Sequence, residues 1–333
     1  MSKRKAPSNE DNLNSDLCDF LIELSNYERN VNRNIFKYNA YRTAASALAS
    51  HSTRITSGKE ALKLDGVGDK IAKKIDEFLS TGTLKKLENI RNDSITESIN
   101  LLTRVSGIGP AKAKQLYDSG IRTLDDLHKN QDKLNHHQLI GLKYFDDFEK
   151  KIPREEVQDI ETIIKESVSR LDPTYLITIC GSYRRGKNQS GDIDVLVTHP
   201  TFVSKGLSKN NSSFLLKQIV NLLEEKKLIT DTLSLGAVKF MGVCKFKDDA
   251  RRLDIRITPY DQYYCAVLYF TGSDLFNKKM RAHALQNNFT LNEYTLRFLG
   301  CTGVPGNPVK IESEKDIFDC IDFPYKSPSE RSM

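Results

Sequence analysis

Apolar residues recur every three or four positions through the first half of the chain, and every second position in short runs of the second half. The first spacing is typical of one face of an α-helix and the second of one face of a β-strand. The helical spacing predicts amphipathic helices over residues 13–27, 35–49, 71–79 and 99–102. The first half is therefore expected to be largely helical.

The pattern changes after residues 152–154. Strand-like runs lie at 175–180, 192–198, 239–246 and 253–258, and the first of them predicts a buried strand. A Ser- and Asn-rich stretch at 204–213 predicts an exposed loop. We therefore predict an α+β, multidomain chain in which a mixed sheet with flanking helices follows the helical half. Helices of the second half are marked by Val157, Ile160, Ile164, Val168 and Leu171, and by Leu215, Ile219 and Leu222.

A repeat lies in the helical half. Residues 64–75 and 105–116 share the order apolar, Gly, apolar, Gly and then a helix, at an offset of 41 positions (105 − 64). This order is typical of a helix-hairpin-helix, a tight turn whose backbone amides, at a helix N-terminus, can receive a phosphate. A single copy is explained by an ordinary turn between helices, whereas two matched copies favour binding of the DNA backbone. The glycines concerned are Gly66, Gly68, Gly107 and Gly109.

The second half carries a candidate metal site. Asp192 and Asp194 begin the predicted strand 192–198, and their side chains share one face because side chains alternate along a strand, while Ile193 and Val195 face the core. Two carboxylates on one face suit Mg²⁺, which prefers hard oxygen ligands and keeps positions open for phosphate oxygens. A bare Asp-x-Asp is more often a solvated strand end or turn.

The residues upstream favour the metal site over that alternative. Gly181 follows the predicted strand 175–180 and lets the backbone approach an anion closely, while Ser182 and Arg185 offer donors to a triphosphate. A phosphate cradle beside paired carboxylates suggests nucleotidyl transfer.

A third carboxylate, Asp254, lies in a further predicted strand. Leu253 and Ile255 face inward, and Asp254 shares the other face with Arg252 and Arg256. An ion pair with a flanking arginine is the alternative role for Asp254. Three aspartates on neighbouring strands would repel one another strongly unless cations lie between them, which favours a shared metal site.

Length, charge and cysteine usage set broader limits. The chain has 333 residues, enough for more than one folding unit, and a formal net charge of +6, which does not by itself indicate a nucleic-acid partner. No run is long and apolar enough to span a membrane, and the polar first residues lack a signal-peptide core. Lys3-Arg4-Lys5 matches either a nuclear address or a disordered tail. Six scattered cysteines predict reduced core residues of an intracellular protein, namely Cys18, Cys180, Cys244, Cys265, Cys301 and Cys320.

Together, the hairpin repeat and the Gly-Ser and Asp-x-Asp motifs resemble those of the X family of DNA polymerases, and within it the polymerase beta type. Matching strings at 38–42, 134–138, 240–244 and 269–274 extend the resemblance nearly end to end. It implies a nucleotidyltransferase-type mixed-sheet palm and a small α+β C-terminal subdomain. The implied order is a disordered tail (1–12), a helical lyase domain with the first hairpin (13–90), a thumb-like DNA-binding domain with the second (91–151), a catalytic palm (152–262) and a nucleotide-selecting subdomain (263–333).

The resemblance also implies roles for single residues. Asp192 and Asp194 would bind two Mg²⁺ ions, and Asp254 would bind the catalytic one and accept the proton of the primer 3′-hydroxyl. One ion would lower the pKa of the hydroxyl and the other would neutralise the triphosphate, with pyrophosphate as the leaving group. Nucleotide contacts are implied for Ser182, Arg185, Gly191, Tyr269, Phe270, Gly272, Asp274 and Asn277, and a template contact for Arg281. A monovalent cation, Na⁺ or K⁺, is implied at the hairpin turns, held by the backbone carbonyls of Leu62, Leu64, Val67, Thr103, Val105 and Ile108.

Lys74 matches the family's Schiff-base nucleophile, which removes a 5′-deoxyribose phosphate by β-elimination. In the repeat Lys74 stands opposite Gln115, so the hairpin scaffold does not itself require a lysine there. Lys70 lies four residues away on the same helix face, and clustered cations depress one another's pKa. A solvated basic face is the alternative. Supporting roles are implied for Lys37, Tyr41, Lys70 and Lys86.

Three positions depart from the better-known members of the family. Phe36 stands where a histidine usually stacks on DNA, Leu62 where a lysine often lies, and Lys73 where a glutamate is common. Lys73 makes the pocket more positive, which favours phosphate binding and leaves the proton relay of the lyase step open.

These implications converge on a monomeric, template-directed gap-filling DNA polymerase with deoxyribose phosphate and abasic-site lyase activity, working in base excision repair. Its expected partners are gapped or nicked DNA with a 5′-phosphate, dNTPs and other repair proteins, and its expected place is the nucleus, with the cytoplasm or mitochondrion as alternatives. One rival is a terminal transferase or end-joining polymerase of the same family, which usually carries a phosphopeptide-binding module with no room before Leu13. The other is a non-catalytic DNA-binding scaffold, which the three aspartates and the Gly-Ser disfavour.

Overall fold

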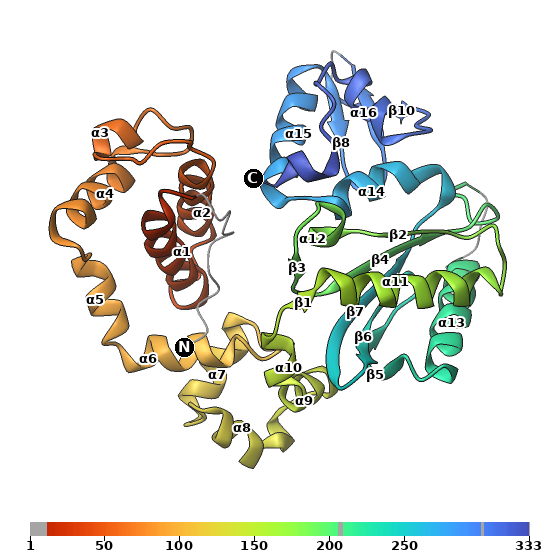
Figure 1. Ribbon diagram of the computed structural model, residues 1–333, viewed down its shortest axis with the longest axis horizontal. Coiled ribbons are helices and arrows are strands. Elements are labelled where there is room, and N and C mark those ends of the chain that lie inside the picture. The colour runs from red at the N-terminus through yellow and green to blue at the C-terminus, as the bar shows by residue number, and fades with distance from the viewer. Residues whose placement is uncertain (1–11, 206–208, 301–302, 333) are drawn as a thin grey trace. The chain divides into compact units, whose positions relative to one another are not determined.

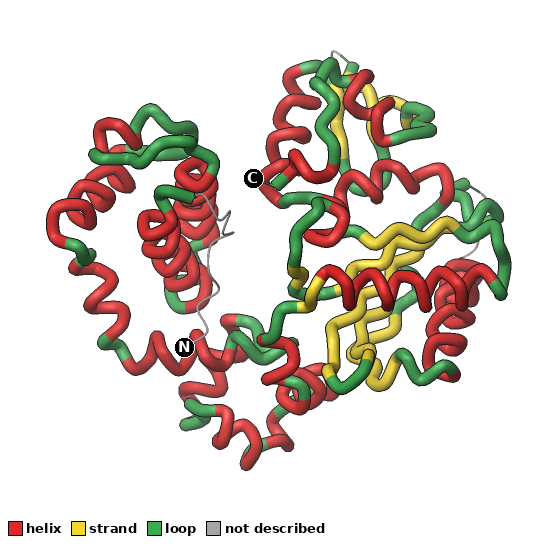
Figure 2. The backbone as a smooth tube through the Cα atoms, in the orientation of Figure 1, coloured by secondary structure: helices red, strands yellow, loops and turns green. Residues whose placement is uncertain are grey.

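The computed structural model of the chain describes residues 12–205, 209–300 and 303–332. The chain divides into two compact units, one that ends at Phe145 and one that runs from Asp146 to Ser332. The first is built of helices and the second of helices and strands, as the red and yellow segments of Figure 2 show. This confirms the predicted α+β, multidomain fold class. The expected tail, apart from Asn12, lies outside the described residues, as does Cys301.

The first unit opens with α1 (Ser15–Asn30), α2 (Ile35–Ala49), α3 (Gly58–Ala61), α4 (Asp69–Thr81) and α5 (Lys85–Arg91) (Figure 1). Their apolar faces meet in one core, where Leu24 of α1 packs with Leu48 of α2 and Ile75 of α4. The predicted ranges 13–27, 35–49 and 71–79 match α1, α2 and α4 to within a few residues. The helix α4 ends at Gly82, whose left-handed backbone (φ 72°) suits a residue without a Cβ.

A second core follows in the same unit. It is formed by α6 (Ser94–Leu102), α7 (Pro110–Asp118), α8 (Leu124–Lys129) and α9 (His136–Lys143), with Leu102, Leu116, Leu127 and Leu142 buried together. The helix α10 (Phe145–Glu149) follows. The prediction 99–102 covered only the last turn of α6, because Ile95 in its first turn is exposed and gives no apolar periodicity.

The second unit contains a five-stranded mixed sheet. Its strands are β2 (Leu176–Ile179), β4 (Ile193–Thr198), β5 (Ile229–Leu235), β6 (Lys239–Phe246) and β7 (Asp249–Ile257), in the order β2-β4-β7-β6-β5. The strands β4 and β7 are parallel, and the other neighbours are antiparallel. Helices α11 (Arg154–Ser169) and α13 (Lys209–Glu225) cover one face, while α14 (Tyr263–Thr271) packs on the other through Leu196 (Figure 1).

The structure corrects three local predictions. The run 175–180 is not a buried strand, since β2 lies at the sheet edge and Leu176 is 38% exposed. The helix α11 ends at Ser169, so Leu171 lies beyond it and is exposed. Residues 209–213 belong to α13 rather than to the predicted loop, since Ser and Asn are common at helix starts as well as in loops.

The strand β5 was not predicted at all. Among its seven residues only Ile229 and Leu233 are buried. This spacing of four is as compatible with a helix as with a strand.

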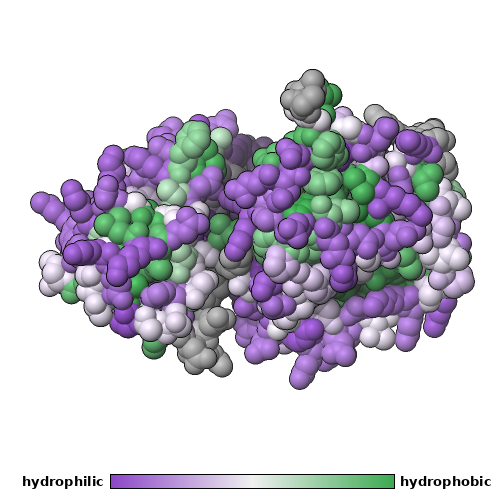
Figure 3. All heavy atoms as spheres, turned by 90° about the horizontal axis from the view of Figure 1, so that it is seen from above, coloured by the Kyte–Doolittle hydropathy of each residue, from purple (hydrophilic) through white to green (hydrophobic). Residues whose placement is uncertain are grey.

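A smaller antiparallel sheet completes the second unit. Its strands β8 (Phe289–Leu291), β9 (Leu296–Leu299) and β10 (Pro305–Pro308) pack with α14, α15 (Asp274–Gln286) and α16 (Glu314–Cys320). Phe276, Leu296 and Phe318 are buried in this core. Seen from above, hydrophilic side chains cover most of the visible face of the chain, with apolar patches scattered among them (Figure 3).

The described cysteines are free thiols, and Cys18, Cys180, Cys244 and Cys265 are buried as predicted. Within the described ranges, no helix combines the length and the apolar character that a membrane span requires.

Candidate active site

The three aspartates lie on neighbouring strands of the larger sheet. Asp192 directly precedes β4, Asp194 is its second residue, and Asp254 lies in β7. In the parallel pairing of β4 and β7, Asp194 stands opposite Asp254. Their neighbours Ile193 and Leu253 are fully buried on the opposite face of the sheet. The register therefore gathers the carboxylates on one face.

Their mutual repulsion is visible in the protonation of Asp194. Burial raises the pKa of Asp194 to about 7, and the charges of Asp192 and Asp254 add to the increase. Burial and the charge of Asp254 also raise the pKa of Asp192. Asp192 is solvent-exposed, so enclosure acts most strongly on the half-buried Asp194. Such a cluster holds its charge only with cations nearby.

Two protein cations engage Asp254. Lys239 Nζ lies 3.1 Å from its Oδ2, and Arg252 Nη2 lies 2.9 Å from its Oδ1. The ion pair with a flanking arginine, considered above as an alternative, is therefore present. It explains why no group of three acidic, histidine or cysteine side chains, among the residues that the structure describes, is arranged to hold a metal ion. The donor set itself, hard oxygens in a partly enclosed negative cluster, fits Mg²⁺.

The Gly-Ser turn lies directly against these carboxylates. It forms the start of the short helix α12 (Gly181–Arg184). Gly181 has a left-handed backbone (φ 60°), and a Cβ there would lie 2.8 Å from Asp194 Oδ2. Only glycine fits this close approach. Ser182 Oγ donates to Ser190 Oγ at 2.9 Å, so it faces β3 (Gln189–Ser190).

The predicted phosphate ligand Arg185 reaches the end of α14. Its Nη1 donates to the carbonyl of Thr271 at 2.6 Å, and burial lowers its pKa. A Cβ on Gly272 would lie 3.3 Å from that Nη1. The structure thus brings together Arg185 and Gly272, which are far apart in sequence.

Lys151 and Lys239 were missed by the sequence analysis. Pairing of β1 (Ile152–Pro153) with β3 brings Lys151 Nζ to 3.6 Å from the position of a Cβ on Gly191, and the charge of Lys151 lowers the pKa of Asp192. No sequence signal links Lys151 to the site, because a two-residue strand has no periodicity. Lys239 had a signal, since it opens a predicted strand beside the one that carries Asp254.

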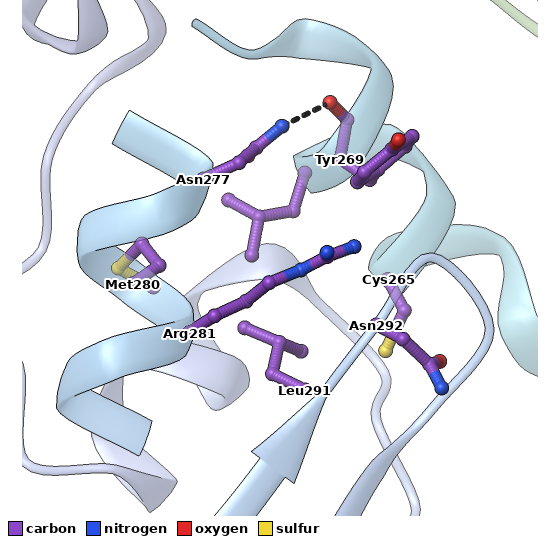
Figure 4. A pocket seen from close by; sticks show the side chains of 8 residues that line it. Cys265, Tyr269, Asn277, Met280, Arg281, Leu291 and Asn292 are labelled. Atoms are coloured by element: carbon purple, nitrogen blue, oxygen red, sulfur yellow. Dashed lines mark hydrogen bonds between the residues drawn. The ribbon is translucent and has the colours of Figure 1, made fainter. Parts of the chain in front are cut away.

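The predicted nucleotide contacts of the C-terminal part cluster around Tyr269. Its ring packs edge-to-face with Phe270 at 5.0 Å, its carbonyl accepts from Asn277 Nδ2 at 2.7 Å, and the Arg281 guanidinium lies 5.1 Å from its ring centre. Figure 4 shows Tyr269, Asn277 and Arg281 at a small pocket. Asp274 is exposed at the start of α15, where it pairs with Lys278 at 3.1 Å.

A buried ionic network lies behind this region. Glu314 of α16 accepts from Arg184 Nη2 at 2.5 Å and from Arg331 Nη1 at 2.6 Å. Arg331 is fully buried, with its guanidinium 5.3 Å from the Phe318 ring centre. Since Arg184 belongs to α12, the network ties the Gly-Ser helix to α16.

We expect Glu314→Gln to lower the free energy of unfolding of the second unit by about 3 kcal/mol, because it leaves two enclosed arginines without their anion. Urea denaturation followed by circular dichroism measures the loss. Glu312→Gln is the matched control, since Glu312 is exposed and pairs only with exposed Lys310. Equal stability of the two variants would contradict a structural role for the network.

The metal-free protein is expected to lose stability as the pH rises through 7. The folded pKa of Asp194, about 7, lies above its ordinary value of 3.8, so the folded state binds the proton more tightly than the unfolded state. The stabilisation is complete below 3.8 and lost as the pH passes 7, amounting to about 4 kcal/mol at most. Urea denaturation in EDTA between pH 5 and 8 measures it. Asp194→Asn should flatten this dependence and be more stable than the wild type at pH 8.

The lysines of the first unit surround a buried carboxylate that the sequence analysis missed. Glu28 is fully buried, 2.7 Å from Lys86 Nζ and 4.0 Å from Lys37 Nζ. Burial raises the pKa of Glu28, but hydrogen bonds from Lys86 and Asn32 outweigh burial and leave it lowered. A signal existed, because Glu28 continues the apolar spacing of Leu24 on α1.

Lys74 itself is half-buried on α4. Its Nζ donates to the carbonyl of Lys70 at 3.1 Å. Burial lowers the pKa of Lys74, and the charges of Lys86 and Lys70 lower it further. The predicted supporting residue Tyr41 is buried, and burial raises its pKa.

The two hairpin turns have matching backbones. Gly66 and Gly107 are left-handed (φ 84° and 88°), and Gly68 and Gly109 cap the N-termini of α4 and α7 with open space beside them. The predicted cation ligands also match between turns. Leu62 and Thr103 are the C-caps of α3 and α6, and the carbonyls of Leu64 and Val105 accept from the N–H groups of Val67 and Ile108.

Comparison with known proteins identifies the family. Four family models match in succession, a helix-hairpin-helix domain (12–84), the fingers domain of DNA polymerase lambda (100–149), the DNA polymerase beta palm (151–260) and the DNA polymerase beta thumb (266–332). These model names call 100–149 fingers and 266–332 thumb. The chain belongs to the X family of DNA polymerases.

The curated relatives are of the lambda and terminal transferase types. The chain is 35% identical to DNA polymerase lambda of Rattus norvegicus, over 91% of this chain and 53% of that protein, and 33% identical to DNA polymerase lambda of Arabidopsis thaliana, over 96% and 62%. It is 28% identical to DNA nucleotidylexotransferase of Xenopus laevis, over 96% and 68%. The chain thus spans about half to three fifths of the two lambda polymerases.

The expected polymerase beta type is therefore corrected to a lambda-like one. The physical reason is that the motifs carrying the resemblance, the hairpins and the aspartates, serve chemistry that the whole family shares. They identify the family and do not separate its members.

Proposed function

We propose that the chain is a template-directed DNA polymerase that fills short gaps during base excision repair. The carrying observation is the contact between the Gly181 turn and Asp194, with Asp254 opposite on the next strand. This places a cradle for a triphosphate beside carboxylates on one rigid sheet. The family membership supports a DNA substrate.

The residues of the chain divide the work of nucleotidyl transfer. Ser182, Arg185 and Lys151 would hold and orient the triphosphate. Tyr269 and Gly272 would line the position of the incoming sugar. Asp254 is the carboxylate that would take the proton of the primer 3′-hydroxyl as the oxygen attacks the α-phosphate and pyrophosphate leaves. Two bound Mg²⁺ ions, held by Asp192, Asp194 and Asp254, would supply charge neutralisation and activation of the attacking oxygen.

We propose a lyase activity for the first unit. Lys74 Nζ would attack the C1′ aldehyde of a 5′-deoxyribose phosphate and lose water to form an imine. Removal of a C2′ proton then breaks the C3′–oxygen bond and frees the 5′-phosphate of the DNA. Lys37 and Lys86, both held by Glu28, would bind phosphate. The hairpin turns would bind the DNA backbone with a monovalent cation, and a nuclear location fits this role.

Extension of a primer across a one-nucleotide gap with a 5′-phosphate tests the polymerase. We expect incorporation of the complementary nucleotide alone, with stronger incorporation on the 5′-phosphorylated gap than on a gap without the phosphate. Equal incorporation of all four nucleotides on a single strand would instead support a terminal transferase, the second candidate that the similarity to DNA nucleotidylexotransferase favours. Binding of DNA without incorporation would support the scaffold.

A further inference from the structure

Asp254 has no free carboxylate oxygen in this structure. Lys239 engages Oδ2 at 3.1 Å and Arg252 engages Oδ1 at 2.9 Å. A divalent cation at Asp254 needs at least one of these oxygens. Binding of the cation therefore requires that a protein cation withdraw.

The two cations differ in how easily they can leave. Arg252 is two residues from Asp254 on β7, and its side chain is 19% exposed. Lys239 starts the neighbouring strand β6, opposite Arg256, and its side chain is 38% exposed. An ammonium on a flexible stem at a strand end can turn to solvent with little loss of packing. Arg256 does not compete for Asp254, since its guanidinium lies over the Phe270 ring at 4.9 Å.

We propose that Lys239 is an internal counter-ion that Asp254 exchanges for the catalytic divalent cation. In the metal-free protein the ammonium neutralises Asp254, and it withdraws when the cation binds. The exchange keeps the affinity of the protein alone for the cation low. This inference rests on the proposed function.

DNA is expected to promote the exchange. The withdrawn ammonium is half exposed, and a polyanion at the site would stabilise it there better than water does. DNA and the divalent cation then bind with positive coupling, and thermodynamic linkage makes the coupling reciprocal. Without Lys239 this part of the coupling disappears.

Binding of Mn²⁺ to the full chain, measured by electron paramagnetic resonance without nucleotide, tests the proposal. We expect Lys239→Ala to bind Mn²⁺ about five- to tenfold more tightly than the wild type, as the loss of a half-exposed ion pair implies. Lys239→Arg should restore the wild-type affinity. Lys245→Ala is the matched control, because it removes an exposed lysine from the same strand, and its affinity should equal that of the wild type.

A second arm adds gapped DNA with a dideoxy-terminated primer. We expect the DNA to tighten Mn²⁺ binding more in the wild type than in Lys239→Ala. Equal or weaker Mn²⁺ affinity in a folded Lys239→Ala would overturn the proposal, as would equal tightening in Lys245→Ala.

Asp254→Asn separates this failure from failure of the proposed function. If Asp254→Asn abolishes Mn²⁺ binding while Lys239→Ala leaves it unchanged, only the counter-ion exchange is wrong. If Asp254→Asn binds Mn²⁺ like the wild type, the aspartates are not the metal site and both proposals fall.

Discussion

Asp254→Asn is expected to slow nucleotide incorporation into a one-nucleotide gap by about a thousandfold, since a metal ligand in phosphoryl transfer is worth several kcal/mol and each 1.36 kcal/mol is tenfold in rate. Asparagine keeps the size of the side chain but removes both the charge and the proton acceptor. Single-turnover extension with excess protein measures the effect on chemistry. Binding of the gapped DNA should stay within about twofold, because the hairpins that hold the backbone lie in the other unit.

Asp248→Asn is the matched control for this loss. Asp248 is exposed in the turn between β6 and β7 and makes the same change of charge six positions away (254 − 248). Its incorporation rate should equal that of the wild type. The borohydride cross-linking of Asp254→Asn should also be unchanged, because that reaction belongs to Lys74. Incorporation by Asp254→Asn within tenfold of the wild type would argue against the aspartate site.

The strand pattern was sufficient to predict the aspartate cluster. A β-strand has a fixed period of two, so Asp192 and Asp194 had to share a face once Ile193 was assigned to the core, and the same holds for Asp254 between Leu253 and Ile255. What the period cannot give is the partner strand. The parallel pairing of Asp194 with Asp254 depends on a crossover through two further strands, and one of these, β5, has no clear pattern.

The positively charged residues of the site were harder to predict. Lys151 reaches Gly191 only through the two-residue pairing of β1 with β3. Arg184 and Arg331 meet Glu314 across 130 and 17 residues. Long flexible side chains carry little positional information in sequence, because many backbone arrangements allow the same contact. Glu28 is the exception, since a charged residue on the apolar face of α1 indicates a buried function.

The two candidate sites balance charge in opposite ways. Asp192, Asp194 and Asp254 form an excess of negative charge that protein cations neutralise in part, and the remainder raises the pKa of Asp194. In the first unit, Lys86 and Lys37 form an excess of positive charge around one carboxylate, and the remainder lowers the pKa of Lys74. The first arrangement favours a cation and the second favours a neutral amine beside a phosphate.

Lys74→Ala is therefore expected to reduce borohydride cross-linking to incised abasic DNA by about a hundredfold, as the loss of a reacting group implies. A neutral amine must attack the aldehyde, and Lys74 is suited to this because burial and nearby charges lower its pKa. Lys86 is a poor substitute. Burial lowers the pKa of Lys86, but its hydrogen bond to Glu28 prevails and leaves it raised. Cross-linked product resolved by denaturing gel electrophoresis measures the effect.

Lys73→Ala is the matched control, because Lys73 is the adjacent residue on α4, carries the same charge and is exposed. It should retain cross-linking within a few-fold of the wild type, and both variants should retain gap filling. Cross-linking should rise with pH in the wild type, since each pH unit below the pKa of Lys74 costs a tenfold loss of neutral amine. Undiminished cross-linking in Lys74→Ala would assign the imine to another lysine, and equal loss in Lys73→Ala would reduce the role of Lys74 to that of a shared basic face.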